Sequence, residues 1–464
     1  MGADTAYQFS HALLREAAYQ LQLPSSRALL HAAAHDLLLE EPEFRDALAF
    51  DLAEHARLAL ADPELPEHLR SRLRLAEPRH LANAAAVARR DFRNADAKAL
   101  LLRLSSHEAA SPRQRADALV KLGITCITLG QNDQAPAYIR QGIQWSESEP
   151  LGVRAGMLVE AATALGVIHR IEDVETICAQ AAPLAEAGGG LDVQVDLLIA
   201  WSIARQQQQQ WQSAGEMLQR ALTIAQEGHD PKRILAVRSN LGILAMHLGQ
   251  NAEAERILQE VIKEASAAHD LSLLCTATGN LGNVRNKQRR YEEGRLLLLQ
   301  GIELAQQLGD RRRELVHLGN LVTSVKQLGE RQQGRVLGAE ALNRAREAGN
   351  LHSVAINAGN LAVSLHEEHY YDEAFGYYLE ALNAAKGCGA LSLVALWQVH
   401  LSLLGTLSSD HELEQHYREL ARQTYHSLGQ KLEDSIYPEA YRSTLAERQL
   451  IDEIESSLRG QRET

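Results

Sequence analysis

Apolar residues recur along this chain at helical spacing, in pairs of segments that follow one another with a 40-residue period. One pair covers 235–248 and 254–265, with the turn residues Gly249-Gln250-Asn251 between the two segments. Apolar spacing of three to four residues on both sides of a short polar turn predicts two helices that pack together. The pattern therefore predicts an all-α chain built from antiparallel helix pairs.

The period is clearest at an Asn-Leu pair. Asn240, Asn280, Asn320 and Asn360 are evenly spaced by one period, and each asparagine is followed by leucine. Each block ends on a pair that favours a helix stop, namely His269-Asp270, Gly309-Asp310, Gly349-Asn350 or Gly389-Ala390. The period continues back to about residue 111 with weaker markers, and 391–430 forms a degenerate last block. About eight pairs are thus expected, which is enough for a stacked solenoid.

Small residues also recur at the period. They are Gly242 and Gly282 in the first helix of a pair, then Ala254, Gly294, Gly334 and Ala374, and further along Gly301, Ala341 and Ala381. We expect the two helices of a pair to approach closely at these positions, because a larger side chain would hold them apart.

The order of large and small residues in Leu281-Gly282, Tyr291, Gly294 and Gly301 resembles tetratricopeptide repeats. The run Asn-Leu-Gly-Asn at 280–283 and the Gly-Asp ending at 309–310 look most like the Leu-Gly-Asn repeat adaptors, and similar long repeats occur in bacterial signal-sensing proteins. The resemblance covers about 111–430. It implies a right-handed superhelical solenoid whose first helices line a concave groove for extended peptides of partner proteins.

The first hundred residues resemble the end of the ATPase module of bacterial STAND-type signalling ATPases, just before their repeat sensor. The positions that carry this resemblance are Phe9-Ser10-His11, Leu14-Arg15-Glu16, Tyr19, Leu23-Pro24, Arg27, Leu30-His31 and Glu54-His55. Helices around 80–88 and 95–104 are placed like the transition helices of such proteins. The expected segments are therefore a winged-helix end and linker at 1–70, a transition pair at 71–110, repeats at 111–430 and a capping helix at 431–464.

No G-x-x-x-x-G-K-[ST] loop occurs in the sequence, so no phosphate-binding loop is expected to hold ATP. Two explanations stay open: the natural protein continues upstream into an ATPase module, or that module has been lost. No metalloprotease motif or nucleophile elbow is present either, and we expect neither catalysis nor a cofactor.

Composition narrows the class of partner. The formal net charge is −13, so neither nucleic acid nor an anionic membrane is expected to bind. Neither a signal peptide nor an apolar run long enough to cross a membrane is present, and the four cysteines stand far apart, so a cytoplasmic protein without a zinc site is predicted. His229 and His269 are one period apart and are expected on separate solvated turns, which argues against a shared metal.

The asparagine column is the best candidate binding site. In the resembled family the residue before Leu-Gly points into the concave groove, and a side-chain amide can both donate to and accept from a peptide backbone. The predicted peptide-binding residues are Asn240, Asn280, Asn283, Asn286, Lys287, Asn320, Lys326, Asn357 and Asn360. The alternative is that these asparagines only tie adjacent helices together.

Two other features are expected to be solvated. One is a basic cluster of Arg285, Lys287, Arg289, Arg290 and Arg295 that continues through 311–313, for which acidic neighbours such as Glu293 favour a solvated face over a docking strip. The other is the run Gln206–Gln210 before Trp211, expected to form a solvated turn.

The sequence thus predicts a non-catalytic scaffold or sensor that binds an extended protein or peptide segment in its groove. The alternative function is the sensor portion of a STAND-type ATPase or transcription activator, which would bind a small inducer or hold the ATPase inactive. The sequence leaves the oligomeric state open.

Overall fold

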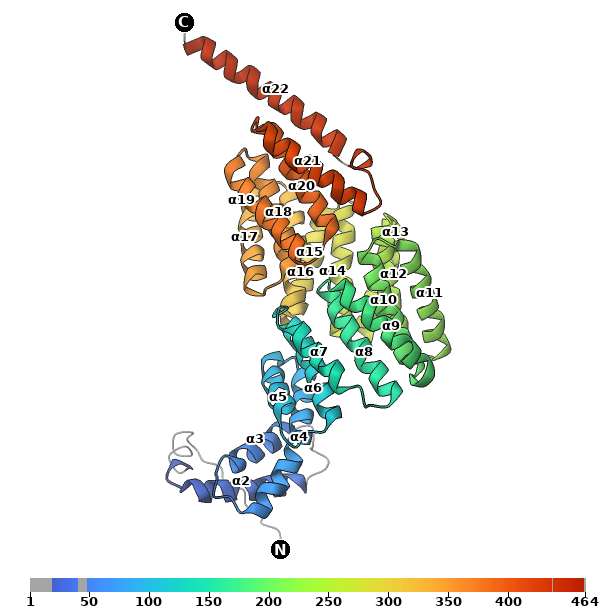
Figure 1. Cartoon of the computed structure of the whole chain (residues 1–464), viewed down its shortest axis with the longest axis vertical. Coiled ribbons are helices and arrows are strands. Elements are labelled where there is room, and N and C mark those ends of the chain that lie inside the picture. Colours follow the sequence, from blue (N-terminus) through green and yellow to red (C-terminus); the bar gives the residue numbers. More distant parts are fainter. Residues whose placement is uncertain (1–18, 41–47, 436, 463–464) are drawn as a thin grey trace. The chain divides into compact units, whose positions relative to one another are not determined.

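The computed structural model describes residues 19–40, 48–435 and 437–462, and within these ranges the regular structure is helical, without a strand (Figure 1). The positions quoted above at 9–11 and 14–16 lie outside the described residues. None of the described helices is both long enough and apolar enough to cross a membrane.

From residue 151 the helices keep one period. The first helices of successive pairs are α8(Leu151–Val167), α10(Leu191–Gln207), α12(Pro231–His247), α14(Leu271–Lys287), α16(Arg311–Gln327), α18(Leu351–Glu367) and α20(Leu391–Leu407). The second helices are α9(Ile171–Gly188), α11(Trp211–Glu227), α13(Asn251–Ala267), α15(Tyr291–Gln307), α17(Arg331–Glu347), α19(Tyr371–Gly387) and α21(His411–Ser427). The predicted helix-pair solenoid is confirmed, and its period is as strict at 151 and 391 as in the middle.

The chain turns by one local device at most helix ends. A residue with positive φ follows the helix, such as Gly309 at 57° or His269 at 54°, and it stops the helix in the left-handed region. At several of these turns the next residue also caps the following helix: the Asp310 carboxylate accepts a hydrogen bond from the Arg313 N–H at 2.8 Å. Equivalent caps come from Asp230, Asp270, Asn350 and Asp410.

The predicted close approach of paired helices is confirmed at Gly242 and Gly282, whereas an added Cβ at Gly334 would make only ordinary contacts. A Cβ atom added at Gly282 would lie 2.8 Å from Leu298 Cγ, and one at Gly242 would lie 3.0 Å from Leu258 Cγ. These separations are shorter than ordinary Cβ contacts, so the leucine of the second helix occupies the space that glycine leaves in the first.

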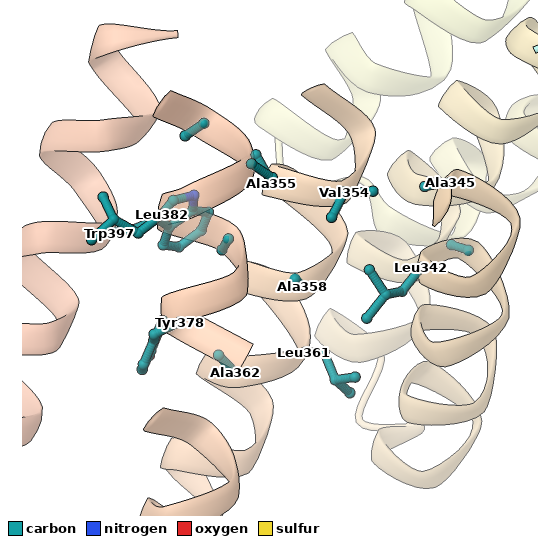
Figure 2. Packing of buried hydrophobic residues seen from close by; sticks show 14 of the residues in the cluster. Leu342, Ala345, Val354, Ala355, Ala358, Leu361, Ala362, Tyr378, Leu382 and Trp397 are labelled. Carbon is teal, nitrogen blue, oxygen red and sulfur yellow. The ribbon is translucent and has the colours of Figure 1, made fainter. Parts of the chain in front are cut away.

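The core runs along the solenoid from one repeat to the next. Figure 2 shows Ala358 and Ala362 of α18 with Tyr378 and Leu382 of α19, and Trp397 of α20 beside them. All five are buried and belong to one apolar cluster that extends from α15 to α20. Each repeat therefore buries its apolar surface against its neighbours, as expected of a repeat solenoid.

Two compact units are present. Unit 1 comprises residues 1–125 and 137–149, and it holds α2(Pro24–Leu39), α3(Ala49–Leu60), α4(Glu67–Arg90), α5(Asn94–Ser106), most of α6(Pro112–Thr128) and most of α7(Ala135–Trp145). Unit 2 comprises 126–136 and 150–464 and ends in η2(Leu432–Asp434) and α22(Tyr437–Arg462). The predicted segment boundaries at 70, 110 and 430 remain predictions.

Candidate binding cavity

Unit 2 contains a partly open cavity of about 970 Å³ that is lined by residues from every first helix between α8 and α20. The position within the first helix that lines the cavity changes from repeat to repeat. Val167 is the last residue of α8, Thr276 is the sixth residue of α14, and His352 is the second residue of α18. The cavity therefore crosses the first helices diagonally, from their carboxyl ends in the early repeats to their amino ends in the late ones.

Contacts between distant repeats border this cavity. His169, in the turn after α8, stacks on His352 of α18 with ring centroids 3.6 Å apart and planes 21° apart. In addition, the Gln430 side-chain amide donates to Gln209 Oε1 at 3.2 Å, across 221 residues of sequence. Helix α18 begins five pairs after α8, so unit 2 winds far enough for its late repeats to meet its early ones.

Burial sets the charge state of the paired imidazoles. Burial is the main cause that lowers the pKa of His169 to about 3, and the nearby His352 and Arg312 contribute to this shift. Burial alone lowers the pKa of His352 to about 4. Both rings are thus neutral at pH 7, and they can stack without charge repulsion.

One wall combines apolar surface with side-chain amides. Trp211 stacks on His247 with ring centroids 5.4 Å apart, beside Ile203 and Ile243. The Gln207 amide donates to the Gly166 carbonyl at 2.7 Å, whereas its buried Oε1 has no hydrogen-bond partner among the described residues. The glutamine run therefore contributes to the cavity wall, and the expectation that it forms only a solvated turn is wrong.

Another part of the lining carries positive charge. Arg312 and Arg313, at the start of α16, line the cavity, and no aspartate or glutamate lies among its described lining residues. Arg313 is neutralised by Asp310, with Nη1 and Oδ2 3.0 Å apart. Arg312 forms no hydrogen bond or ion pair with any described residue.

Of the nine predicted peptide-binding residues, Asn240 is the one that lines this cavity. Its Nδ2 donates to the Ala236 carbonyl of its own helix at 2.9 Å, which leaves Oδ1 as an acceptor. Asn280, Asn320 and Asn360 occupy the same position of their helices and are partly buried outside the cavity. A position repeated at a 40-residue spacing cannot follow a cavity that crosses the helices diagonally.

The other predicted residues have contacts within the solenoid or lie at its surface. Asn286 is buried, donates to the Asn320 carbonyl at 3.2 Å and accepts from Ser324 Oγ at 2.8 Å. Asn357 is buried and donates to the Ser353 carbonyl at 2.9 Å. Lys326 Nζ lies 3.0 Å from Glu367 Oε2, Asn283 is partly buried, and Lys287 is exposed.

The basic cluster is mostly paired. Arg290 contacts Glu293 at 2.6 Å and Arg295 contacts Glu330 at 3.0 Å, as expected for a solvated face. Arg285 differs from that expectation, because it is buried against Glu255. No signal in the sequence separates Arg312 from these paired neighbours, since its isolation depends on repeats distant in sequence.

The remaining candidate chemistry is limited. His229 and His269 are both exposed, as predicted. Burial raises the pKa of the Cys178 thiol to about 12 and that of Cys275 to about 11, so both stay protonated. Among the described residues, no group of three or more His, Cys, Asp or Glu is placed to hold a metal ion.

Residues 196–263 match the family model of the tetratricopeptide repeat. No curated protein sequence matches the chain. Among solved structures, a Rap protein complexed with competence and sporulation factor is 12% identical, with a TM-score of 0.52 over 74% of this chain and 99% of that one. A STAND protein with a tetratricopeptide repeat sensor from Pyrococcus horikoshii is 15% identical, with a TM-score of 0.49 over 97% of this chain and 63% of that one.

Proposed function

We propose that this tetratricopeptide-repeat solenoid is a binding protein that holds an extended peptide, or an extended segment of another protein, in the cavity of unit 2. The observation that carries the proposal is a set of buried polar atoms without partners among the described residues. Gln207 Oε1 and His352 Nδ1 are both buried and unbonded, and both residues line the cavity. Buried polar atoms in proteins are nearly always hydrogen-bonded, so a ligand that bonds to them would complete the site.

The lining suits a peptide. Gln207 Oε1 and Asn240 Oδ1 can accept hydrogen bonds from backbone N–H groups whatever the side chains are. Trp211, Ile203 and Ile243 offer apolar surface for side chains of the ligand. The proposal keeps the predicted groove binding and moves its centre from the asparagine column to the diagonal cavity.

The similar Rap structure supports the proposal in a general way. Its fold matches over most of this chain, and it was solved as a complex with competence and sporulation factor. A solenoid of this architecture can therefore hold another molecule. The proposed role requires no catalytic step, because the cavity is assigned to recognition alone.

Affinity selection tests the proposal. The whole chain is immobilised and exposed to a randomised pentapeptide library, and retained peptides are identified by mass spectrometry. Thr276→Trp places an indole in the cavity, while Thr223→Trp is its matched control, because Thr223 is exposed on α11 and both hydroxyls bond to the carbonyl four residues earlier. We expect retention by the wild type and Thr223→Trp but not by Thr276→Trp.

A small inducer is the second candidate ligand, in keeping with the alternative of a sensor portion. The volume of about 970 Å³ favours it, because cavities of roughly 300–1,000 Å³ are typical of small-molecule sites. A metabolite mixture applied to the same three proteins separates the candidates. Retention of a metabolite and no peptide, lost in Thr276→Trp, would replace the peptide proposal.

A further inference from the structure

The cavity of unit 2 differs in charge from the protein around it. The chain has a formal net charge of −13, yet the described lining of the cavity has two arginines and no carboxylate. Because Arg313 pairs with Asp310 and the imidazoles of His169 and His352 are neutral at pH 7, Arg312 supplies the net charge of the wall. The wall therefore offers one positive charge to whatever enters.

Arg312 is held in an unfavourable environment for a cation. Burial lowers the pKa of its guanidinium, Asp310 opposes this shift, and Arg313 adds to it. An arginine nevertheless stays protonated in proteins, so the cost is a charge without a partner rather than a neutral side chain. Charges withdrawn from bulk water are normally paired, and an unpaired one in a cavity points to a ligand of opposite charge.

The amino ends of three helices add partial positive charge near Arg312. Helices α16, α18 and α20 all line the cavity with residues of their first turn, where the helix dipole favours negative charge. The field therefore favours an anion beside Arg312.

We infer that the peptide bound in this cavity carries a carboxylate that pairs with the Arg312 guanidinium. This inference rests on the proposed function. A carboxylate matches the planar fork of an arginine, and its single negative charge matches the single unpaired positive charge of the wall. A phosphate dianion would leave one of its charges without a partner. The carboxylate can belong to the C-terminus of the peptide or to an acidic side chain.

The probes are four randomised, N-acetylated pentapeptide pools. The first has a free C-terminus and no acidic side chain, and the second has a C-terminal amide and one Asp or Glu. The third has a C-terminal amide and only neutral residues, and the fourth replaces one of these by phosphoserine. Retention on the whole chain is measured for each pool, and the first two pools separate the two sources of the carboxylate.

Arg312→Gln is compared with Arg311→Gln, the same change at the adjacent exposed residue outside the cavity. We expect the wild type to prefer the first or the second pool over the third. Arg312→Gln should bind that preferred pool at least about tenfold more weakly than the wild type does, since charge-assisted hydrogen bonds are the strong ones. Without ligand, Arg312→Gln should melt at a higher temperature than the wild type, because an unpaired charge is removed; a merely structural arginine would give the opposite shift.

The outcomes are distinct. If the neutral pool is retained as well as the two carboxylate pools, or if Arg312→Gln binds as the wild type does, the inferred carboxylate is overturned. The cavity then remains a peptide site, provided that Thr276→Trp abolishes retention. Preference for the phosphoserine pool overturns the carboxylate in favour of a dianion. Retention of no pool overturns the proposed function and this inference together.

Discussion

The imidazoles of His169 and His352 stack 3.6 Å apart although they belong to repeats that are distant in sequence, and this contact joins the early and late repeats of unit 2. The two rings cannot both be protonated in this contact, because two imidazolium ions at that distance would repel each other, and burial disfavours the charge on either ring. The pair therefore couples closure of the cavity to pH.

Acid should open this contact. The folded-state pKa values of about 3 for His169 and about 4 for His352 lie below the ordinary 6.5, so the unfolded chain binds more protons between these values. The contribution of the pair to stability is present above about pH 6.5 and is lost as the pH falls towards 4. His352→Phe, which keeps an aromatic ring, should flatten the fall in melting temperature across this window.

The control for that measurement is His416→Phe on an exposed part of α21. It should leave the pH dependence as in the wild type. His317 and His400 also have pKa values lowered to about 4 by burial, so His352→Phe should reduce the dependence and not abolish it. An unchanged slope in His352→Phe would show that the stack does not contribute.

Asn286 should matter for stability and not for binding. Its amide joins the repeats by bonding to the Asn320 carbonyl and Ser324 Oγ, so Asn286→Ala removes both bonds and takes away the acceptor of the buried Ser324 hydroxyl. The expected loss is about 1–3 kcal/mol in the free energy of unfolding. Urea unfolding measures it, with Asn283→Ala as the control at a partly buried position; peptide retention should be unchanged in both.

Two glycine substitutions should change the free energy of unfolding in opposite directions. Gly282→Ala places a methyl group 2.8 Å from Leu298 Cγ and should destabilise the chain by about 1–3 kcal/mol. Gly376, inside α19, has no atom within 4 Å of an added Cβ, and Gly376→Ala should stabilise by about 0.5–1 kcal/mol. Thermal or urea unfolding of the two variants measures these changes. Equal changes in stability at Gly282 and Gly376 would contradict the packing described here.

The asparagine column can be tested one residue at a time. Because Asn240 lines the cavity and Asn280 and Asn320 lie outside it, Asn240→Ala should weaken peptide retention more than the double variant Asn280→Ala, Asn320→Ala. A larger loss of affinity in the double variant would favour the predicted ladder. A lower melting temperature in the double variant with unchanged affinity would make those two asparagines structural.

The period can be predicted from the sequence because helix pairs of fixed length need the same turn every time. Glycines such as Gly249 and Gly309 mark the turns in the middle repeats, and the Asn-Leu pairs mark the first helices. In the early repeats the left-handed turn residues are His169 and Gln209, whose side chains give no such signal although the backbone is the same. The sequence signals of the turns are therefore weaker in the early repeats, although the helix pairs there keep the same period.

The binding site is harder to predict, because it depends on how far the chain twists from one repeat to the next. A 40-residue spacing gives the position within a helix but not the direction in which a cavity crosses successive helices. Asn240 lies both in the predicted column and in the cavity because the cavity crosses α12 at that position. Arg312 resembles its paired neighbours in the sequence, since its isolation arises only after distant repeats meet.

The central claim is that the cavity of unit 2 binds a peptide. Titration calorimetry with one peptide recovered from the selection tests it most directly, on the wild type, Thr276→Trp and Thr223→Trp. We predict one peptide per chain for the wild type and Thr223→Trp, and no heat of binding for a folded Thr276→Trp. Equal binding by all three proteins would place the peptide elsewhere and contradict the account.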